Sequence, residues 1–220
     1  MNVRDCRLRI ADCGLVAVLV LGVGLLLGAG SGKVLFSQDF EKVAPGAPPE
    51  DLQVLNGEFS VKKVEGNMCL ELAPDPLDSD SVFFGAADKN AYTVSARVWA
   101  EASGKRMPEF GVGACGPDSF RLWLMPAVGQ LQLLSRSDVL KEMPFKWESG
   151  TWVRFKLQVM AGEGGKFTVR GKAWKDGGEE PAEWMLSAET ATAPRPGRAG
   201  VLATPYSGKV TRFDDLRVEE

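Results

Sequence analysis

One stretch of the chain, residues 151–174, restricts the fold more than any other. It reads TWVRFKLQVM, a Gly-rich turn and KFTVRGKAW, and apolar residues alternate with polar ones on both sides of the turn. Because successive side chains of a strand point to opposite sides, this alternation is typical of a strand with one buried face. We therefore predict a β-hairpin whose apolar floor lies beneath a face of cations and tryptophan.

Similar short runs, separated by frequent turn signals, fill the rest of the chain beyond Lys33. No helical period accompanies them, and no internal repeat of the length found in propellers or solenoids. This spacing predicts an all-β fold, a two-sheet antiparallel jelly-roll β-sandwich. Besides the hairpin, strands are expected at residues 34–40, 58–64, 68–72, 81–84, 91–100, 109–114, 120–125, 130–135, 139–143, 200–204 and 209–218.

The N-terminal segment, residues 1–32, has the organisation of a secretory signal. Three arginines precede an uncharged run whose apolar part, residues 15–29, is short for a membrane span, which needs about 20 residues. Small residues at 29–31 suit cleavage, so we expect a signal peptide at 1–32 and a β-sandwich domain at 33–220. The protein would then be periplasmic, on the cell surface or secreted. An uncleaved N-terminal anchor is the alternative, and the only expected membrane contact.

The charge and the cysteines add weaker limits. The chain has a net charge of −3, and residues 33–220 alone carry −4, so no basic footprint for nucleic acid is present. The remaining length suits one domain. Cys69 and Cys115 are the only cysteines after residue 32. They can pair in an oxidising compartment or remain buried free thiols.

The absence of histidine from all 220 residues excludes Ser-His-Asp and Cys-His catalysis and imidazole metal sites. Carboxylate chemistry, chiefly glycoside hydrolysis by two acids, remains possible. No predicted strand carries acids two residues apart, the spacing that would put them on one face. The neighbours Asp214 and Asp215 are expected to point to opposite faces. We therefore expect a non-catalytic protein, with catalysis by acids from separate strands left open.

Strand parity pairs tryptophan with arginine on one side of four predicted strands. Indole offers a flat apolar plate and guanidinium a planar set of donors, which together can hold a pyranose ring and its hydroxyls or carboxylates. Packing of the aromatics at the ends of the core is the alternative. The predicted ligand-binding pairs are Arg97 with Trp99, Arg121 with Trp123, Trp152 with Arg154, and Arg170 with Trp174.

Acidic residues gather near both ends of the mature chain. Asp39 and Glu41 end the first predicted strand, and Asp214 lies in the last one. First and last strands of a jelly roll often lie together, so these oxygens could hold one structural calcium ion. A second, loop-borne candidate is the set Asp75, Asp78 and Asp80. Solvated loops are the alternative in both cases.

Several short segments resemble the concanavalin A-like lectin and glucanase superfamily. They are VLFSQDFE, TWVRFKLQV with VRGKAW, EEPAEW and GKVTRFDDLRV. Within that superfamily they resemble the laminin-G-like and family 16 glycoside hydrolase-like domains of secreted bacterial proteins, including the 3-keto-disaccharide hydrolase type. The resemblance implies a concave face that often binds sugars, and a calcium ion between first and last strands, which matches Asp39, Glu41 and Asp214. The ExDxxE strand of family 16 glucanases is absent, so their activity is not expected.

Three functions follow from these patterns. The first is a secreted or cell-envelope carbohydrate-binding module, a lectin-like protein without catalysis. The second is a 3-keto-disaccharide hydrolase-like glycosidase that uses carboxylates from separate strands. The third is a structural envelope scaffold that binds protein. An open groove lined by the tryptophans would favour the first function, and a face filled by its own side chains the third.

Overall fold

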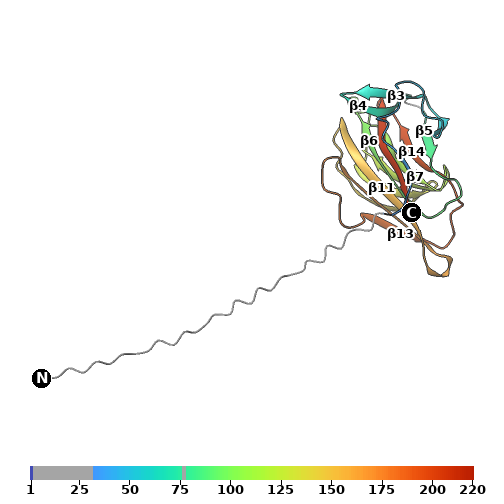
Figure 1. Cartoon of the computed structure of the whole chain (residues 1–220), viewed down its shortest axis with the longest axis vertical. Helices are drawn as coiled ribbons and strands as arrows, with labels where there is room; N and C mark the ends of the chain where they lie inside the picture. Colours follow the sequence, from blue (N-terminus) through green and yellow to red (C-terminus); the bar gives the residue numbers. More distant parts are fainter. Residues whose placement is uncertain (2–31, 76–77) are drawn as a thin grey trace. The chain divides into compact units, whose positions relative to one another are not determined.

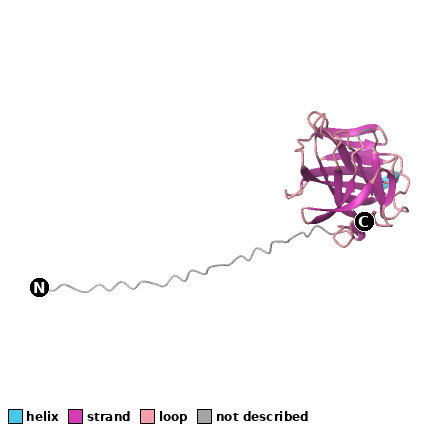
Figure 2. Ribbon diagram, turned by 90° about the horizontal axis from the view of Figure 1, so that it is seen from above, coloured by secondary structure: helices cyan, strands magenta, loops and turns pink. Residues whose placement is uncertain are grey.

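A computed structural model describes residue 1, residues 32–75 and residues 78–220. The expected signal peptide lies outside the described residues, except for Met1 and Gly32. From residue 32 onward the chain folds as one compact unit of two antiparallel sheets (Figures 1 and 2). The expected jelly-roll sandwich is therefore confirmed. Within the described ranges, no helix has the length and apolar character needed to cross a membrane.

The larger sheet, sheet A, has eight strands and carries the hairpin predicted from the sequence. Its order is β13-β12-β11-β6-β15-β4-β3, with β1 paired to β15. The strands are β1 (Val34–Gln38), β3 (Phe59–Val64), β4 (Asn67–Leu72), β6 (Tyr92–Ala100), β11 (Thr151–Ala161), β12 (Phe167–Lys175), β13 (Leu186–Thr190) and β15 (Thr211–Glu219).

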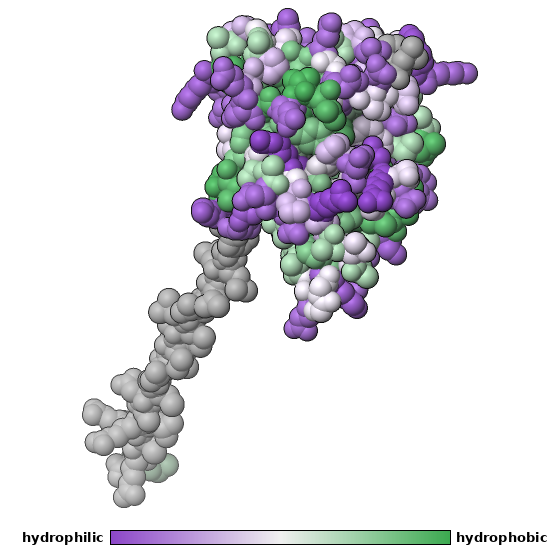
Figure 3. Space-filling view, turned by 90° about the vertical axis from the view of Figure 1, so that its right-hand side faces the viewer, coloured by the Kyte–Doolittle hydropathy of each residue, from purple (hydrophilic) through white to green (hydrophobic). Residues whose placement is uncertain are grey.

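The smaller sheet, sheet B, has seven strands in the order β10-β9-β8-β7-β14-β5-β2. In the view from the side nearest β5 and β14, hydrophobic side chains form a patch within a mostly hydrophilic surface (Figure 3). The strands are β2 (Gln53–Asn56), β5 (Asp80–Phe84), β7 (Glu109–Ala114), β8 (Phe120–Met125), β9 (Gln130–Ser135), β10 (Asp138–Pro144) and β14 (Ala199–Thr204).

The core lies between the sheets and uses the apolar parity of each strand. Phe155 of β11 is fully buried and meets Phe110 of β7 edge-on, with ring centroids 5.9 Å apart. A Cβ on Gly171 of β12 would lie 2.7 Å from the Leu122 side chain of β8. The glycine therefore allows the two sheets to approach closely.

Most predicted strands are confirmed to within a few residues, but two were missed. All four residues of β2 are exposed at the edge of sheet B, so it has no buried parity to recognise. The short β13 also lies at a sheet edge, and only Leu186 is buried. The turn of the hairpin contains a single 3-10 turn, Glu163–Gly165. Cys69 and Cys115 are both buried and free, which agrees with the thiol alternative.

Candidate functional site

The outward side chains of β4, β15, β6, β11 and β12 form one continuous polar face of sheet A, here called the polar face. The pairing register places Trp152 opposite Trp99 and Arg154 opposite Arg97, and Trp174 lies on the other side of Arg154. Parity thus brings three of the predicted tryptophan and arginine pairs to one surface. Arg170 of the third pair lies opposite Gln158 of β11.

A β-bulge in β15 brings two aspartates to this face. The register between β15 and β6 shifts between Asp214 and Arg217, and Asp215 has a φ of 52°. Asp214 Oδ2 lies 2.6 Å from Arg97 Nη2, and Asp215 Oδ2 lies 3.3 Å from Arg97 Nε. The expectation that neighbouring aspartates point to opposite faces is therefore wrong here, because a bulge breaks strand alternation.

Two arginines and three aspartates form an ion-pair cluster at the centre of the polar face. Asp176, directly after β12, accepts hydrogen bonds from Arg97 Nη1 at 3.2 Å and from Arg154 Nε. Arg154 Nη2 also donates to Asp215 Oδ2 at 3.0 Å. Asp214 is almost completely buried, with 1% of its side chain exposed, and Asn67 also donates to it at 2.8 Å.

The surroundings shift the pKa values of two of these carboxyl groups in opposite directions. Burial alone would raise the pKa of Asp176, but hydrogen bonds and charges from Arg154 and Arg97 outweigh it and lower that pKa. For Asp214, burial dominates and raises the pKa, against Asn67, the Asp215 backbone N–H and Arg97. The cluster therefore contains a firmly ionised acid beside one that is costly to ionise.

The loop after β12 is held onto the polar face by cations. Glu180 Oε1 lies 2.8 Å from both Lys156 Nζ and Lys172 Nζ. Lys172 is almost buried and also donates to the Pro181 carbonyl at 2.7 Å. At the end of the loop, the Trp184 ring lies 4.6 Å from the Arg170 guanidinium carbon. The polar face is thus partly filled by the protein's own side chains.

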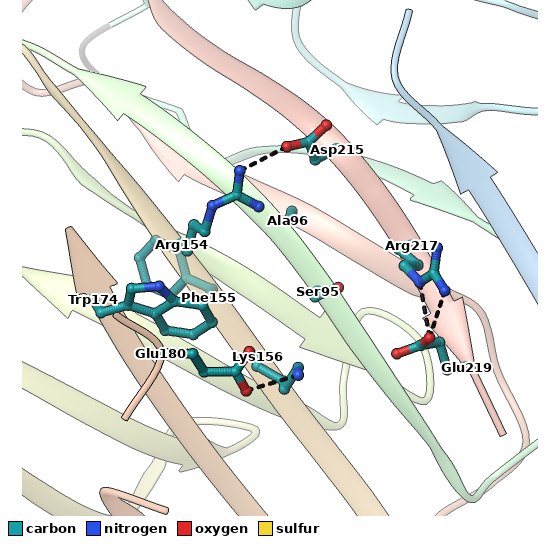
Figure 4. A pocket seen from close by; sticks show the side chains of 10 residues that line it. All are labelled: Ser95, Ala96, Arg154, Phe155, Lys156, Trp174, Glu180, Asp215, Arg217 and Glu219. Carbon is teal, nitrogen blue, oxygen red and sulfur yellow. Dashed lines mark hydrogen bonds and ion pairs between the residues drawn. The ribbon is translucent and has the colours of Figure 1, made fainter. Parts of the chain in front are cut away.

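One hollow of about 160 Å³ remains open between β12 and β15 (Figure 4). Ser95 forms part of its floor, and its short side chain lies opposite Lys156 on one side and Arg217 on the other. Trp174 and Glu180 form one wall. The hollow therefore places an indole beside donors and acceptors of fixed position. Its lining residues are Ser95, Ala96, Arg154, Phe155, Lys156, Trp174, Glu180, Asp215, Arg217 and Glu219.

A second hollow, of about 310 Å³, lies toward β4 on the same face. Trp99, Trp152 and Gly150 line it together with Cys69, whose burial raises its thiol pKa to about 11. A thiol with so high a pKa stays protonated at neutral pH and is a poor nucleophile. This hollow therefore offers shape and aromatic surface, without a reactive cysteine.

Trp174 differs from the other indoles in the described part of the chain. Trp99 has Arg212 above its ring at 4.3 Å, and Trp152 has Arg97 at 4.7 Å. Trp147 packs against Phe110, Trp123 lies under Arg121, and Trp184 lies under Arg170. Among the described residues, no cation or aromatic ring covers Trp174, which is half-buried in the wall of the first hollow.

The predicted pair Arg121 and Trp123 is not part of this site. Both lie on β8 in sheet B, on the opposite layer of the sandwich. Trp123 is 6% exposed and donates its Nε1–H to Glu109 at 3.1 Å. Parity predicted their common side correctly, but parity cannot assign a strand to a sheet.

The expected calcium ligands have partners within the protein. Asp39 accepts from the Glu41 backbone N–H, and Glu41 accepts from that of Met68. Asp214 already has the positive charge of Arg97, which would repel a metal ion. In the described ranges, no group of three cysteine or acidic side chains is placed to hold a metal. Calcium binding itself stays a prediction, at these residues or at Asp75, Asp78 and Asp80.

Several residues of the site were not predicted from the sequence. The alternation along residues 151–174 already placed Lys156 and Lys172 on the side of the cations and tryptophans, but they were not named as ligand-binding residues. Asp176, Glu180 and Trp184 follow β12 in a loop, where no periodicity indicates direction. Only the folded structure shows that these three residues lie on the polar face.

Comparisons with known proteins support the fold. No protein-family description matches the chain, and a search of curated protein sequences finds no match. The structure is similar to a PL-14 alginate lyase from Aplysia kurodai, with a TM-score of 0.57, 10% identity, and 84% of this chain and 98% of that one covered. It is also similar to a GH131 β-glucanase catalytic domain from Podospora anserina, with a TM-score of 0.55, 10% identity, and coverage of 86% and 96%.

A sialidase is a third similar structure, with a TM-score of 0.55 and 15% identity. The match covers 86% of this chain but only 19% of the sialidase. At these identities the likeness establishes the fold alone, a β-sandwich that also occurs in carbohydrate-active proteins.

Proposed function

We propose that the protein is a secreted or cell-envelope carbohydrate-binding module that holds a glycan on the polar face without cleaving it. The observation that carries this proposal is Trp174, an uncovered indole in the wall of an open hollow. A pyranose ring stacks on such a plate through its C–H groups, while its hydroxyls need donors and acceptors at the edges. Arg154, Lys156 and Glu180 supply these at fixed positions.

The fold neighbours are consistent with this proposal. Proteins named as an alginate lyase, a β-glucanase and a sialidase share the sandwich, and each name refers to a carbohydrate. The second hollow, with Trp99 and Trp152, would extend the binding surface to further sugar residues of a polymer. The scaffold alternative gains from the partly filled face, but the uncovered Trp174 favours a glycan.

A second candidate function is glycoside hydrolysis by acids from separate strands. Asp176 and Asp214 bind two nitrogens of one guanidinium, and their pKa values are shifted apart, as in an acid and base pair. However, Asp214 is almost inaccessible, and both carboxylates are held in ion pairs with Arg97. We therefore rank hydrolysis below binding.

Affinity electrophoresis in gels that each contain one polysaccharide tests the proposal. The protein should be retarded by at least one polymer, and Trp174→Ala should remove most of the retardation. Trp123→Phe, on the other sheet, should behave like the wild type. Equal retardation of the wild type and Trp174→Ala would contradict the assignment of this face. Release of reducing sugar that is lost in Asp176→Asn would favour the hydrolase instead.

A further inference from the structure

We infer that the glycan held on the polar face is a neutral polymer and not a polyuronate or a sulfated chain. This inference rests on the proposed function and narrows its ligand class. It comes from the charge balance of the face, which is specific to the side chains of this chain.

All but one of the arginines and lysines of the polar face form ion pairs with carboxylates. Arg97 and Arg154 share Asp176, Asp214 and Asp215. Lys156 and Lys172 share Glu180 at 2.8 Å. Arg212 pairs with Glu71 at 2.9 Å, and Arg217 pairs with Glu219 at 2.7 Å.

Arg170 is the one cation of these five strands without an ion pair among the described residues. Its Nε donates to Gln158 Oε1 at 2.7 Å, and its guanidinium lies over Trp184. Arg170 keeps its positive charge and its Nη donors, but it lines neither hollow. The unpaired cation therefore lies outside the two hollows in which we place the glycan.

This balance has two consequences for an incoming ligand. A carboxylate or sulfate gains little long-range attraction from a nearly balanced face, and it competes with an existing carboxylate for each paired cation. The most buried cations are held best against displacement: 7% of the Lys172 side chain and 18% of the Arg97 side chain are exposed. A hydroxyl group, in contrast, can donate to a carboxylate oxygen and accept from a neighbouring cation without breaking the pair.

The first hollow shows the same balance on a smaller scale. Its cations Arg154, Lys156 and Arg217 face the acids Asp215, Glu180 and Glu219, each bonded to one of them (Figure 4). The space beside Trp174 is therefore surrounded by alternating donors and acceptors. That pattern suits the hydroxyl groups of a neutral sugar ring.

The test measures binding to pairs of polymers that share a backbone and differ in charge. Suitable pairs are hydroxyethylcellulose with carboxymethylcellulose, and fully methyl-esterified with de-esterified homogalacturonan, beside neutral β-glucan, mannan and galactan. We expect the neutral polymers to bind at least ten times more tightly than charged ones, with less than a twofold change between 20 and 500 mM NaCl. Tighter binding of charged polymers, weakened steeply by salt, would overturn the inference.

Trp174→Ala separates the two proposals. If charged polymers bind best and Trp174→Ala abolishes that binding, the proposed function stands and the inference fails. If no polymer of either kind binds, both are overturned.

Glu180→Gln provides an independent arm, because it leaves Lys156 and Lys172 without their carboxylate. It should raise the affinity for de-esterified homogalacturonan at least fivefold. Glu163→Gln changes the net charge equally but lies in the exposed hairpin turn, and it should have no effect. Equal gains in the two variants, or no gain in Glu180→Gln, would contradict the role of the matched pairs.

Discussion

Asp214 and Asp215 are neighbours in the sequence, yet both carboxylates contact the guanidinium of Arg97. On a regular strand they would point to opposite sides of the sheet. The bulge at Asp215 removes that restriction and places two acids on the polar face. Asp176 completes the cluster from a loop, so four separate segments of the sequence supply its charges.

The Arg97 cluster should contribute strongly to stability. Arg97→Met leaves the carboxylate of Asp214 buried without its cation, and loss of one partner from a buried ion pair costs about 3 kcal/mol. Urea unfolding should show this loss. Asp214→Asn removes the buried charge. The double variant Arg97→Met, Asp214→Asn should therefore recover part of the stability that Arg97→Met alone loses. An Arg97→Met protein that is as stable as the wild type would contradict this account.

The contribution of Asp176 should depend on pH. Its pKa in the folded state is lowered, so its stabilising effect is complete above the ordinary carboxyl value near 4 and is lost as the pH falls through the folded value. We expect Asp176→Asn to be less stable than the wild type by about 1 kcal/mol at pH 7. Urea unfolding at pH 7, 5, 4 and 3 should show this difference shrinking at the acid end. If the difference in unfolding free energy between the two proteins grew toward pH 3, the pKa of Asp176 would be shifted in the other direction.

Gly171 should be intolerant of a side chain. A Cβ there would lie 2.7 Å from Leu122 of the facing sheet, so Gly171→Ala should overpack the core and cost about 1 to 3 kcal/mol. Gly162→Ala is the matched control, because its Cβ would be 3.4 Å from the Lys166 carbonyl oxygen. Thermal unfolding compares the two variants. Equal melting temperatures of the two variants would contradict the close contact between Gly171 and Leu122.

The two cysteines after residue 32 should remain thiols. Cys69 lies on sheet A and Cys115 directly follows β7 of sheet B, and both are buried and free. Burial raises the pKa of each to about 11, which slows alkylation in the folded protein. Alkylation with and without denaturant, followed by peptide mass spectrometry, should label both residues only after unfolding. A disulfide-linked peptide pair without reduction would contradict the structure.

The fold could be predicted because the patterns that indicate it lie within single strands and the turns between them. Alternation along residues 151–174 and the spacing of the other runs indicate a sandwich, and β7, β8 and β9 were predicted with their observed bounds. The edge strand β2 was not predicted because neither of its sides is buried, so its sequence does not alternate between apolar and polar residues. Parity is a property of one strand and survives folding unless a bulge intervenes.

The site was predictable only in part, because it depends on which strands become neighbours. Arg97, Trp99, Trp152, Arg154, Arg170 and Trp174 share one face, as their parity suggested. Arg121 and Trp123 have the same pattern and belong to the other sheet. The sequence also could not indicate that Arg212 and Arg97 cover two of the indoles and leave Trp174 open.

The central claim is that a glycan occupies the hollow beside Trp174. The most direct measurement is NMR titration of the protein with the polysaccharide that retards it most, following the backbone amides and the indole N–H signals. The account predicts shifts at Trp174, Ser95 and Lys156, with the Trp123 indole of sheet B unmoved. Shifts centred on sheet B, or none on the polar face despite measured binding, would contradict it.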